Sequence, residues 1–263
     1  MSYQYILYTV DSGIATLTLN RPDRMNALLE EMQPEFMDAI AKAKADDGVR
    51  VLIVTGAGKA FCSGADVSRL DRQMSGGSAH TLKKVTAPVG YFLLPLYDFP
   101  KPTIAMVNGP LAGGGISIAL ACELRVASEQ ARFMPAWLAR GIAPDGGASW
   151  LLPRVIGYAR AVEVLYTAKP LEAREALALG IYNRVVPADQ LAGATRELAL
   201  AIAAQPPIAV ELAKRALQRG KETTLAEALD FETHAQQLCF KTGDFREAIT
   251  AFREKRSPTF SGK

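Results

Sequence analysis

The sequence predicts an α/β domain followed by an all-helical C-terminal region. Two observations lead to this prediction. Strand-like and helix-like segments alternate up to residue 186, and from residue 188 onward every segment has helical periodicity. Because 49% of the 263 residues are hydrophobic, the chain can bury a sizeable core. We expect residues 1–200 to form the α/β core and residues 201–263 to form the helical region.

The N-terminal segments indicate a hairpin and a helix. Residues 15–20, ATLTLN, alternate apolar and polar side chains as a half-buried strand does. The residues DSG at 11–13 predict a turn that joins this strand to another at 5–10. Apolar residues at every fourth position from 28 to 40 predict an amphipathic helix, whose regular part begins near Pro34.

The remaining segments continue the alternation and then become helical. Further strands are predicted at 49–54, 103–107, 124–127, 132–133 and 182–186. Helices are predicted at 149–156, 160–167 and 172–179. The C-terminal region is expected to break at residues 205–207, QPP, and at 241–243, KTG.

Composition and charge exclude several function classes. The formal net charge of +3 is small and no dense Lys/Arg block is present, so nucleic acid is not an expected partner. Three widely spaced cysteines fit a reducing compartment and supply neither a disulfide framework nor a metal-ligand spacing. The sequence contains no recognisable signal peptide and no apolar run long enough to span a bilayer. We therefore expect a soluble cytoplasmic protein that binds neither a metal nor a membrane.

Two segments combine a strand end with small residues that could bind an oxyanion. In KAFCSGAD, residues 59–66, the small residues at 62–65 let the backbone approach a ligand closely. NGPLAGGG, residues 108–115, precedes the helix-like ISIALACEL. Glycines that open a helix leave backbone N–H groups free, and these groups would stabilise a carbonyl oxygen that gains negative charge. Tight packing of a strand-to-helix turn is the alternative reason for the glycines, and no dinucleotide or phosphate-loop spacing is present.

Four segments carry a wider resemblance, namely GKAFCSGADVSRL, AMVNGPLAGGGISIALACELRVAS, GIAPDGGASWLLPRVIG and FREKRSPTF. In this order and spacing they resemble the enoyl-CoA hydratase/isomerase (crotonase) superfamily, over essentially the whole chain. The resemblance implies a spiral of ββα units whose C-terminal helices mediate trimer formation, and hence a homotrimer or homohexamer. It also implies an acyl-CoA substrate and no separate cofactor, because coenzyme A enters as part of the substrate.

The resemblance implies an oxyanion hole built from backbone N–H groups. The donors would be Ala65, which follows Gly64, and Gly114, which follows Gly113. Together they would bind the thioester oxygen of the acyl-CoA.

The resemblance also places the coenzyme A part of the substrate. It would lie against segment 24–28, which includes Arg24 and Ala27, and against the backbone of Asp66 and Val67. Lys255 in the EKR ending would approach the phosphates. Taken alone, Arg24 and Lys255 are equally well explained as solvated surface charges.

The pattern departs from that of a hydratase at two positions. Hydratases of this superfamily add water with two glutamates, and the matching positions here are Ser117 and Trp137. The remaining acid is Asp145, where several isomerase branches of the superfamily place an aspartate. One carboxylate can remove a proton and return it elsewhere on the same face of the substrate. The resemblance therefore implies an enoyl-CoA isomerase with Asp145 as its single acid/base.

Other interpretations of these residues remain open at the level of sequence. Asp145 could cap the helix that begins near Ala148, and Trp137 could be a pocket wall or donate a hydrogen bond to substrate. Ser117 is expected to be a small residue that leaves room for the acyl group. A hydratase-type activity and a binding protein on the same scaffold are further alternatives. Tyr91, Phe92 and Leu94 could line the acyl pocket, although such residues more often form ordinary core.

A hydrolytic enzyme is another alternative. The 4-chlorobenzoyl-CoA dehalogenase branch also carries Ala-Trp followed by Asp at this spacing, and there the aspartate is a nucleophile. A histidine assists that reaction, and residues 89–97 contain none here. His80 and His234 are expected to lie elsewhere, which weakens this alternative.

Overall fold

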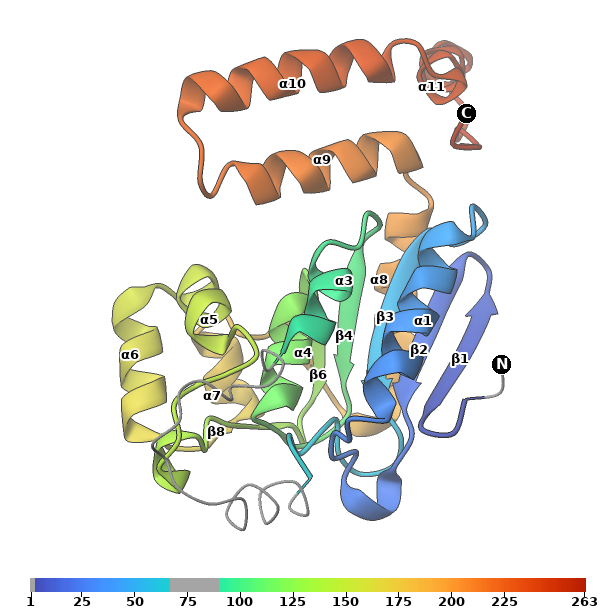
Figure 1. Cartoon of the computed structure of the whole chain (residues 1–263). Helices are drawn as coiled ribbons and strands as arrows, with labels where there is room; N and C mark the ends of the chain where they lie inside the picture. The colour runs from blue at the N-terminus through green and yellow to red at the C-terminus, as the bar shows by residue number, and fades with distance from the viewer. Residues whose placement is uncertain (1–2, 67–89) are drawn as a thin grey trace.

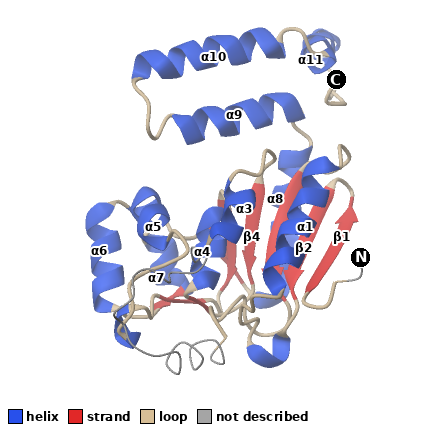
Figure 2. Ribbon diagram, viewed as in Figure 1, coloured by secondary structure: helices blue, strands red, loops and turns tan. Residues whose placement is uncertain are grey.

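A six-stranded sheet forms the centre of the molecule, with helices on both faces (Figures 1 and 2). The computed structural model describes residues 3–66 and 90–263. The first strand pair in the sheet is antiparallel, as the hairpin prediction requires, and the later pairs are parallel. In spatial order the strands are β1 (Ile6–Asp11), β2 (Ile14–Leu19), β3 (Val51–Gly56), β4 (Thr103–Val107), β6 (Leu124–Ser128) and β9 (Arg184–Val186).

The two faces of the sheet carry separate cores because successive side chains of a strand point to opposite faces. In β3, Leu52 and Val54 pack in the larger core, together with residues of α1 (Met32–Ala45) and α4 (Gly114–Ala121). Val51 and Ile53 pack in the smaller core, beneath α8 (Leu191–Ala203). Every residue of β3 is buried, as is typical of a parallel strand that is covered on both faces.

A second, three-stranded sheet lies beside the central one. Its strands are β5 (Leu111–Ala112), β7 (Arg132–Met134) and β8 (Leu171–Glu172). Two of these strands have only two residues, too few for a periodic pattern, and the sequence analysis missed both. The helices that follow them in this part are α5 (Ala148–Ile156), α6 (Tyr158–Thr167) and α7 (Ala173–Ala178).

Short helical turns complete the described core. The 3₁₀ turns are η1 (Pro22–Arg24), η3 (Tyr91–Leu93), η4 (Leu138–Arg140) and η5 (Ala188–Gln190), and α3 (Leu94–Tyr97) is a single α-helical turn. The predicted helix over 28–40 begins only at Met32, with Pro34 in its first turn. Leu28 instead forms an isolated bridge with Ala65, so its apolar side chain fitted the helical spacing by coincidence.

Three helices form a separate layer at one end of the sheet (Figure 1): α9 (Pro207–Arg219), α10 (Leu225–Cys239) and α11 (Gly243–Glu254). The predicted breaks at 205–207 and 241–243 are confirmed, but the break between α9 and α10 was missed. A sequence signal for it exists, because Thr224 and Glu227 form a capping box at the start of α10. Lys214 of α9 is buried and joins this layer to the core through an ion pair with Glu123, at 2.9 Å.

Candidate active site

The two segments expected to bind an oxyanion lie side by side. The backbone N–H of Ala112 donates to the carbonyl oxygen of Cys62 at 2.9 Å. The backbones are so close that a Cβ atom on Gly115 would lie 2.3 Å from that same oxygen. Gly64 has a φ of +89°, and a Cβ there would lie 2.9 Å from the carbonyl oxygen of Ala112. The glycines are therefore needed for close packing, and this packing is what brings the two loops together.

Ala65 and Gly114 each present a free backbone N–H. Neither group donates to any acceptor in the described part of the chain. Gly114 is the first residue of α4, and the N–H groups of a first helical turn have no acceptor within the helix. The neighbours of Ala65 are bonded instead, because Gly64 accepts from Leu28 at 2.7 Å and Asp66 donates to Leu28 at 3.1 Å. Two free donors on adjoining loops can stabilise an oxygen that gains charge.

Asp145 is held by the two residues that occupy the expected glutamate positions. Its carboxylate Oδ1 accepts a hydrogen bond from the indole Nε1 of Trp137 at 2.9 Å. Its backbone carbonyl accepts one from Ser117 Oγ at 3.2 Å. Trp137 and Ser117 are both buried, whereas Asp145 is half-buried. The sequence analysis considered a Trp137 bond to substrate, but in the structure this N–H is bound to the acid itself.

The helix-cap interpretation of Asp145 is wrong. α5 begins at Ala148, its cap position is Gly147, and no side chain caps it. Asp145 contributes only its backbone carbonyl, which accepts from the N–H of Ala148 at 3.0 Å. The carboxylate of Asp145 therefore does not cap the N-terminus of α5.

The Asp145 loop lies against the first turn of α4. Ser117, which contacts Asp145, follows Gly114 by three residues, and a helix rises about 1.5 Å per residue. Gly146 packs on the same serine, since a Cβ there would lie 2.7 Å from Ser117 Oγ. The backbone of Asp145 is thus placed beside Ser117, which lies about one helical turn from Gly114 along α4.

The segments expected to contact coenzyme A also lie together. The guanidinium of Arg21 donates from Nη1 to the carbonyl of Ala27 at 2.6 Å and to Asp66 Oδ2 at 3.0 Å. The side chain of buried Asn26 donates from Nδ2 to the backbone carbonyl of Ala60 at 2.7 Å. This buried hydrogen bond also holds segment 24–28 against the loop that carries Ala65. The sequence analysis missed Arg21 and Asn26, because no local pattern marks either residue. Arg24 is largely exposed.

One expected site residue of the described part of the chain, Lys255, is not brought to this place. Lys255 is the C-cap of α11, and α11 lies at the opposite end of the sheet from the start of α4 (Figure 1). Val67 lies outside the described residues, as does His80. His234 is exposed on α10, with its Nδ1 at 2.7 Å from the carbonyl of Asp230. Within one chain, therefore, neither Lys255 nor His234 lies near Asp145.

The cysteine that adjoins the first loop is a packing residue. Cys62 is fully buried, and burial raises the pKa of its thiol to about 12. A thiol with that pKa is protonated at neutral pH and is a poor nucleophile.

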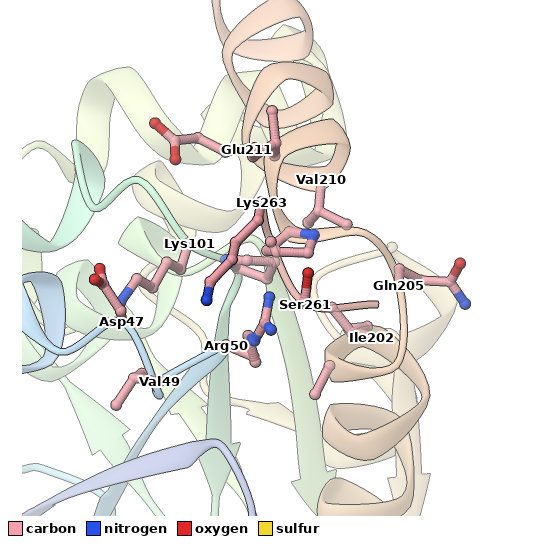
Figure 3. A pocket seen from close by; sticks show the side chains of 15 residues that line it. Asp47, Val49, Arg50, Lys101, Ile202, Gln205, Val210, Glu211, Ser261 and Lys263 are labelled. Atoms are coloured by element: carbon pink, nitrogen blue, oxygen red, sulfur yellow. The ribbon is translucent and has the colours of Figure 1, made fainter. Parts of the chain in front are cut away.

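A polar cavity of about 310 Å³ lies elsewhere, where the start of β3 meets the connection from α8 to α9 (Figure 3). Arg50 and Lys263 point into it, and Lys101 and Glu211 flank it. The Nζ of Lys101 already donates hydrogen bonds to the backbone carbonyls of Ala43 and Asp46. Burial also lowers the pKa of Lys101. This cavity lies before the first residues of β3 and β4, whereas ligands of parallel sheets bind beyond the carboxyl ends of the strands. We interpret it as a gap in the packing between the core and the C-terminal helices.

Comparisons with known proteins show which family the chain resembles over its whole length. A family model described as enoyl-CoA hydratase/isomerase matches residues 9–263. The chain is 36% identical over 260 residues to the 1,2-epoxyphenylacetyl-CoA isomerase of Escherichia coli, with 99% of each chain covered. It is 36% identical over 265 residues to the crotonyl-CoA hydratase of Syntrophomonas wolfei, with 100% of each covered. A solved enoyl-CoA hydratase from Bacillus anthracis matches with a TM-score of 0.91 at 34% identity, covering 99% of this chain and 100% of that one.

Proposed function

Because the chain belongs to the enoyl-CoA hydratase/isomerase family, we propose that it is an enoyl-CoA isomerase in which Asp145 is the single acid/base. The observation that carries this proposal is the pair of contacts to Asp145 from Ser117 and Trp137. The resemblance assigns the two water-activating glutamates of a hydratase to these two positions. Here neither residue supplies a carboxylate: Trp137 binds the carboxylate of Asp145, and Ser117 binds the backbone carbonyl of the same residue.

The proposed reaction uses the two loops and the acid together. The thioester oxygen accepts hydrogen bonds from the N–H groups of Ala65 and Gly114, which stabilise the enolate that forms when a proton leaves. Asp145 removes that proton from one carbon and returns it to another, so the substrate changes its bonding and gains or loses no atoms. Trp137 holds Oδ1, which leaves Oδ2 to carry the proton.

Water addition has less support from these side chains. It requires a base that orients and deprotonates a water molecule and an acid that delivers a proton to carbon. The hydroxyl of Ser117 already donates to the carbonyl of Asp145, and the indole of Trp137 can only donate. Asp145 would have to perform both roles by itself.

The experiment is a panel of linear enoyl, dienoyl and aromatic acyl-CoA thioesters, followed by ultraviolet absorbance and product mass. We expect at least one substrate to change absorbance without a change in mass, and Asp145→Asn to abolish that change. Asp189→Asn, a matched control on η5, should leave it intact.

Other outcomes would contradict the isomerase proposal. A product heavier by one water would indicate a hydratase. Transfer of solvent oxygen into the Asp145 carboxylate in a single turnover would indicate a nucleophilic, dehalogenase-type mechanism. RNA affinity without turnover would indicate a binding protein.

We also propose that the protein is a homotrimer or homohexamer assembled through α9–α11, without a separate cofactor. Large apolar side chains on these helices are exposed, among them Leu217 at 75%, Leu225 at 77% and Phe252 at 82%. If Lys255 contacts the phosphates of coenzyme A, it must do so from another copy of the chain, because α11 lies far from the two loops (Figure 1).

The three unpaired cysteines support a reducing, cytoplasmic location. None of the helices in the described ranges combines the length and apolar character that crossing a bilayer requires.

A further inference from the structure

A buried lysine of the C-terminal layer takes part in a polar network that the proposed mechanism does not use. Lys214 lies on α9, the helix that crosses above the central sheet in Figure 1, and its side chain is only 6% exposed. Its Nζ contacts Glu123 Oε1 at 2.9 Å and donates to the backbone carbonyl of Lys101, also at 2.9 Å. A charge taken out of water in this way is strongly destabilising once it loses its partner.

Glu123 carries this network from α9 to the C-terminal end of α4. It is the second residue after Ala121, the last residue of α4. Its other oxygen, Oε2, accepts from the backbone N–H of Thr103 at 2.9 Å and from the Thr103 hydroxyl at 2.8 Å. That hydroxyl oxygen in turn accepts from the backbone N–H of Glu123 at 3.1 Å. The residues that end α4 are thus tied to the first residue of β4 and to α9.

A second cation binds the same end of α4 from inside the core. The guanidinium of buried Arg125 donates from Nη1 to the backbone carbonyls of Cys122 at 2.7 Å and Ala119 at 3.4 Å. Carbonyl groups at the end of a helix have no partner within it, and a cation there also interacts favourably with the helix dipole. Polar contacts from two elements, β6 and α9, therefore hold the C-terminal end of α4.

These polar contacts define where α4 lies along its own axis. Seven of its eight residues are buried, so apolar packing surrounds the helix. Apolar packing is non-directional, whereas hydrogen bonds and ion pairs place particular atoms at particular distances. The helix is only about 12 Å long, so a shift at its C-terminal end is passed on to Gly114 at its first residue.

We propose, on the basis of the proposed function, that Lys214 is a positioning residue for the oxyanion donor Gly114. It acts through Glu123, which fixes α4 so that the Gly114 N–H keeps its distance from the thioester oxygen. Small displacements are sufficient to matter, because a misplacement of about 1 Å can lower a rate by about 100-fold. The ion pair thereby couples the C-terminal layer to the site.

Lys214→Met tests the proposal, because methionine keeps an unbranched apolar stem and removes the charged donor. We expect kcat to fall by about tenfold with little change in KM, since a donor to the enolate oxygen acts mainly in the transition state. Arg215→Met, one residue further along α9, is the matched control. Arg215 is 57% exposed and pairs with Glu211 of the same helix, so its loss should leave kcat unchanged.

A double variant separates positioning from stability. Lys214→Met leaves the Glu123 carboxylate without its cation, which lowers the melting temperature. Adding Glu123→Gln removes that charge, and the amide oxygen can still accept from the N–H of Thr103. We expect the double variant to recover melting temperature but not kcat, because the link from α9 to α4 is still missing. If Lys214→Met alone does not fold, the double variant supplies the comparison.

The thioester carbonyl gives a readout that does not depend on turnover. A saturated acyl-CoA with ¹³C at this carbonyl is bound to each protein, and its stretching frequency is measured by isotope-edited infrared spectroscopy. Hydrogen bonds from Ala65 and Gly114 lower the frequency on binding. We expect the wild type and Arg215→Met to show the same downshift, and Lys214→Met and the double variant to show a smaller one.

The two proposals fail in different ways. An unchanged kcat and carbonyl frequency in Lys214→Met would overturn the positioning role and leave the isomerase intact. A double variant that recovers kcat together with its melting temperature would do the same, because it would show that Lys214 serves stability alone. A smaller carbonyl downshift in Lys214→Met, with no thioester turned over by the wild type, would support the positioning role and overturn the isomerase.

Discussion

At the scale of single residues, a direct hydrogen bond joins Trp137 to Asp145. Their contact joins a neutral donor to a carboxylate, and such hydrogen bonds are stronger than those between neutral groups. They are eight residues apart, across the η4 turn and the irregular loop that follows it. In the proposed mechanism Trp137 is a positioning residue, because its indole N–H binds the carboxylate of the proposed acid.

Trp137→Phe tests this role. The ring still packs in its buried place, but the N–H is lost and the carboxylate is free to turn. We expect kcat to fall by about 10-fold to 100-fold, the equivalent of one hydrogen bond to a charged group, with little change in KM. The thermal midpoint of unfolding is measured in parallel. A fall in stability with an unchanged kcat would show that the indole only fills space.

At the scale of elements, the approach of one loop to another decides whether the site forms. The carbonyl oxygen of Cys62 lies against Gly115, and Leu28 Cδ1 lies against Gly114. The first neighbour is backbone and cannot move alone. The second is the end of a flexible side chain and can turn aside. Two adjacent glycines of α4 therefore have different tolerance for a methyl group.

Gly115→Ala and Gly114→Ala should separate these two cases. We expect Gly115→Ala to lower the free energy of unfolding by about 3 kcal/mol, because its Cβ would lie 2.3 Å from a backbone oxygen. That loss corresponds to a fall of roughly 6–12 °C in the melting temperature. Gly114→Ala should cost less than about 1 kcal/mol, since alanine also favours the helix. Equal melting temperatures for the two variants, measured by circular dichroism, would contradict this account.

At the scale of the whole molecule, the C-terminal layer is built differently from the core. No residue of α10 is buried in the single chain, and Phe252 of α11 is 82% exposed. Exposed apolar groups of this size on adjoining helices are typical of a protein–protein interaction surface, and the proposed assembly would cover them. Polar contacts such as the ion pair of Lys214 with Glu123 hold the layer to the core. Such contacts are consistent with helices whose apolar surface faces away from the core.

Phe252→Glu tests assembly through this layer. Light scattering after size-exclusion chromatography should give the wild-type protein the mass of a trimer or hexamer. The variant should move toward the monomer, because a buried carboxylate without a partner is costly. Tyr166→Glu on α6, where Tyr166 is 71% exposed, is the control and should not change the mass. A monomeric wild-type protein would contradict the proposed assembly.

Local sequence patterns were enough to predict most of the central sheet and the helices that cover it. Period-two alternation located β2, the DSG turn indicated β1 as its hairpin partner, and buried apolar runs located β3 and β4. The glycine motifs located both loops that carry the free N–H groups, and the lone acid in an apolar stretch located Asp145. These features depend on neighbours in the chain, so they can be recognised without a structure.

Contacts between distant segments were decided only by the tertiary structure. The pairing of Arg21 with Asp66 joins residues 45 positions apart, and the contact of Ser117 with Asp145 spans 28. By itself, the sequence determined most of the longer strands and helices and the residue types available for chemistry. The direction of each side chain toward another came from packing, because that packing minimises exposed apolar area over the whole chain at once and not over any one segment.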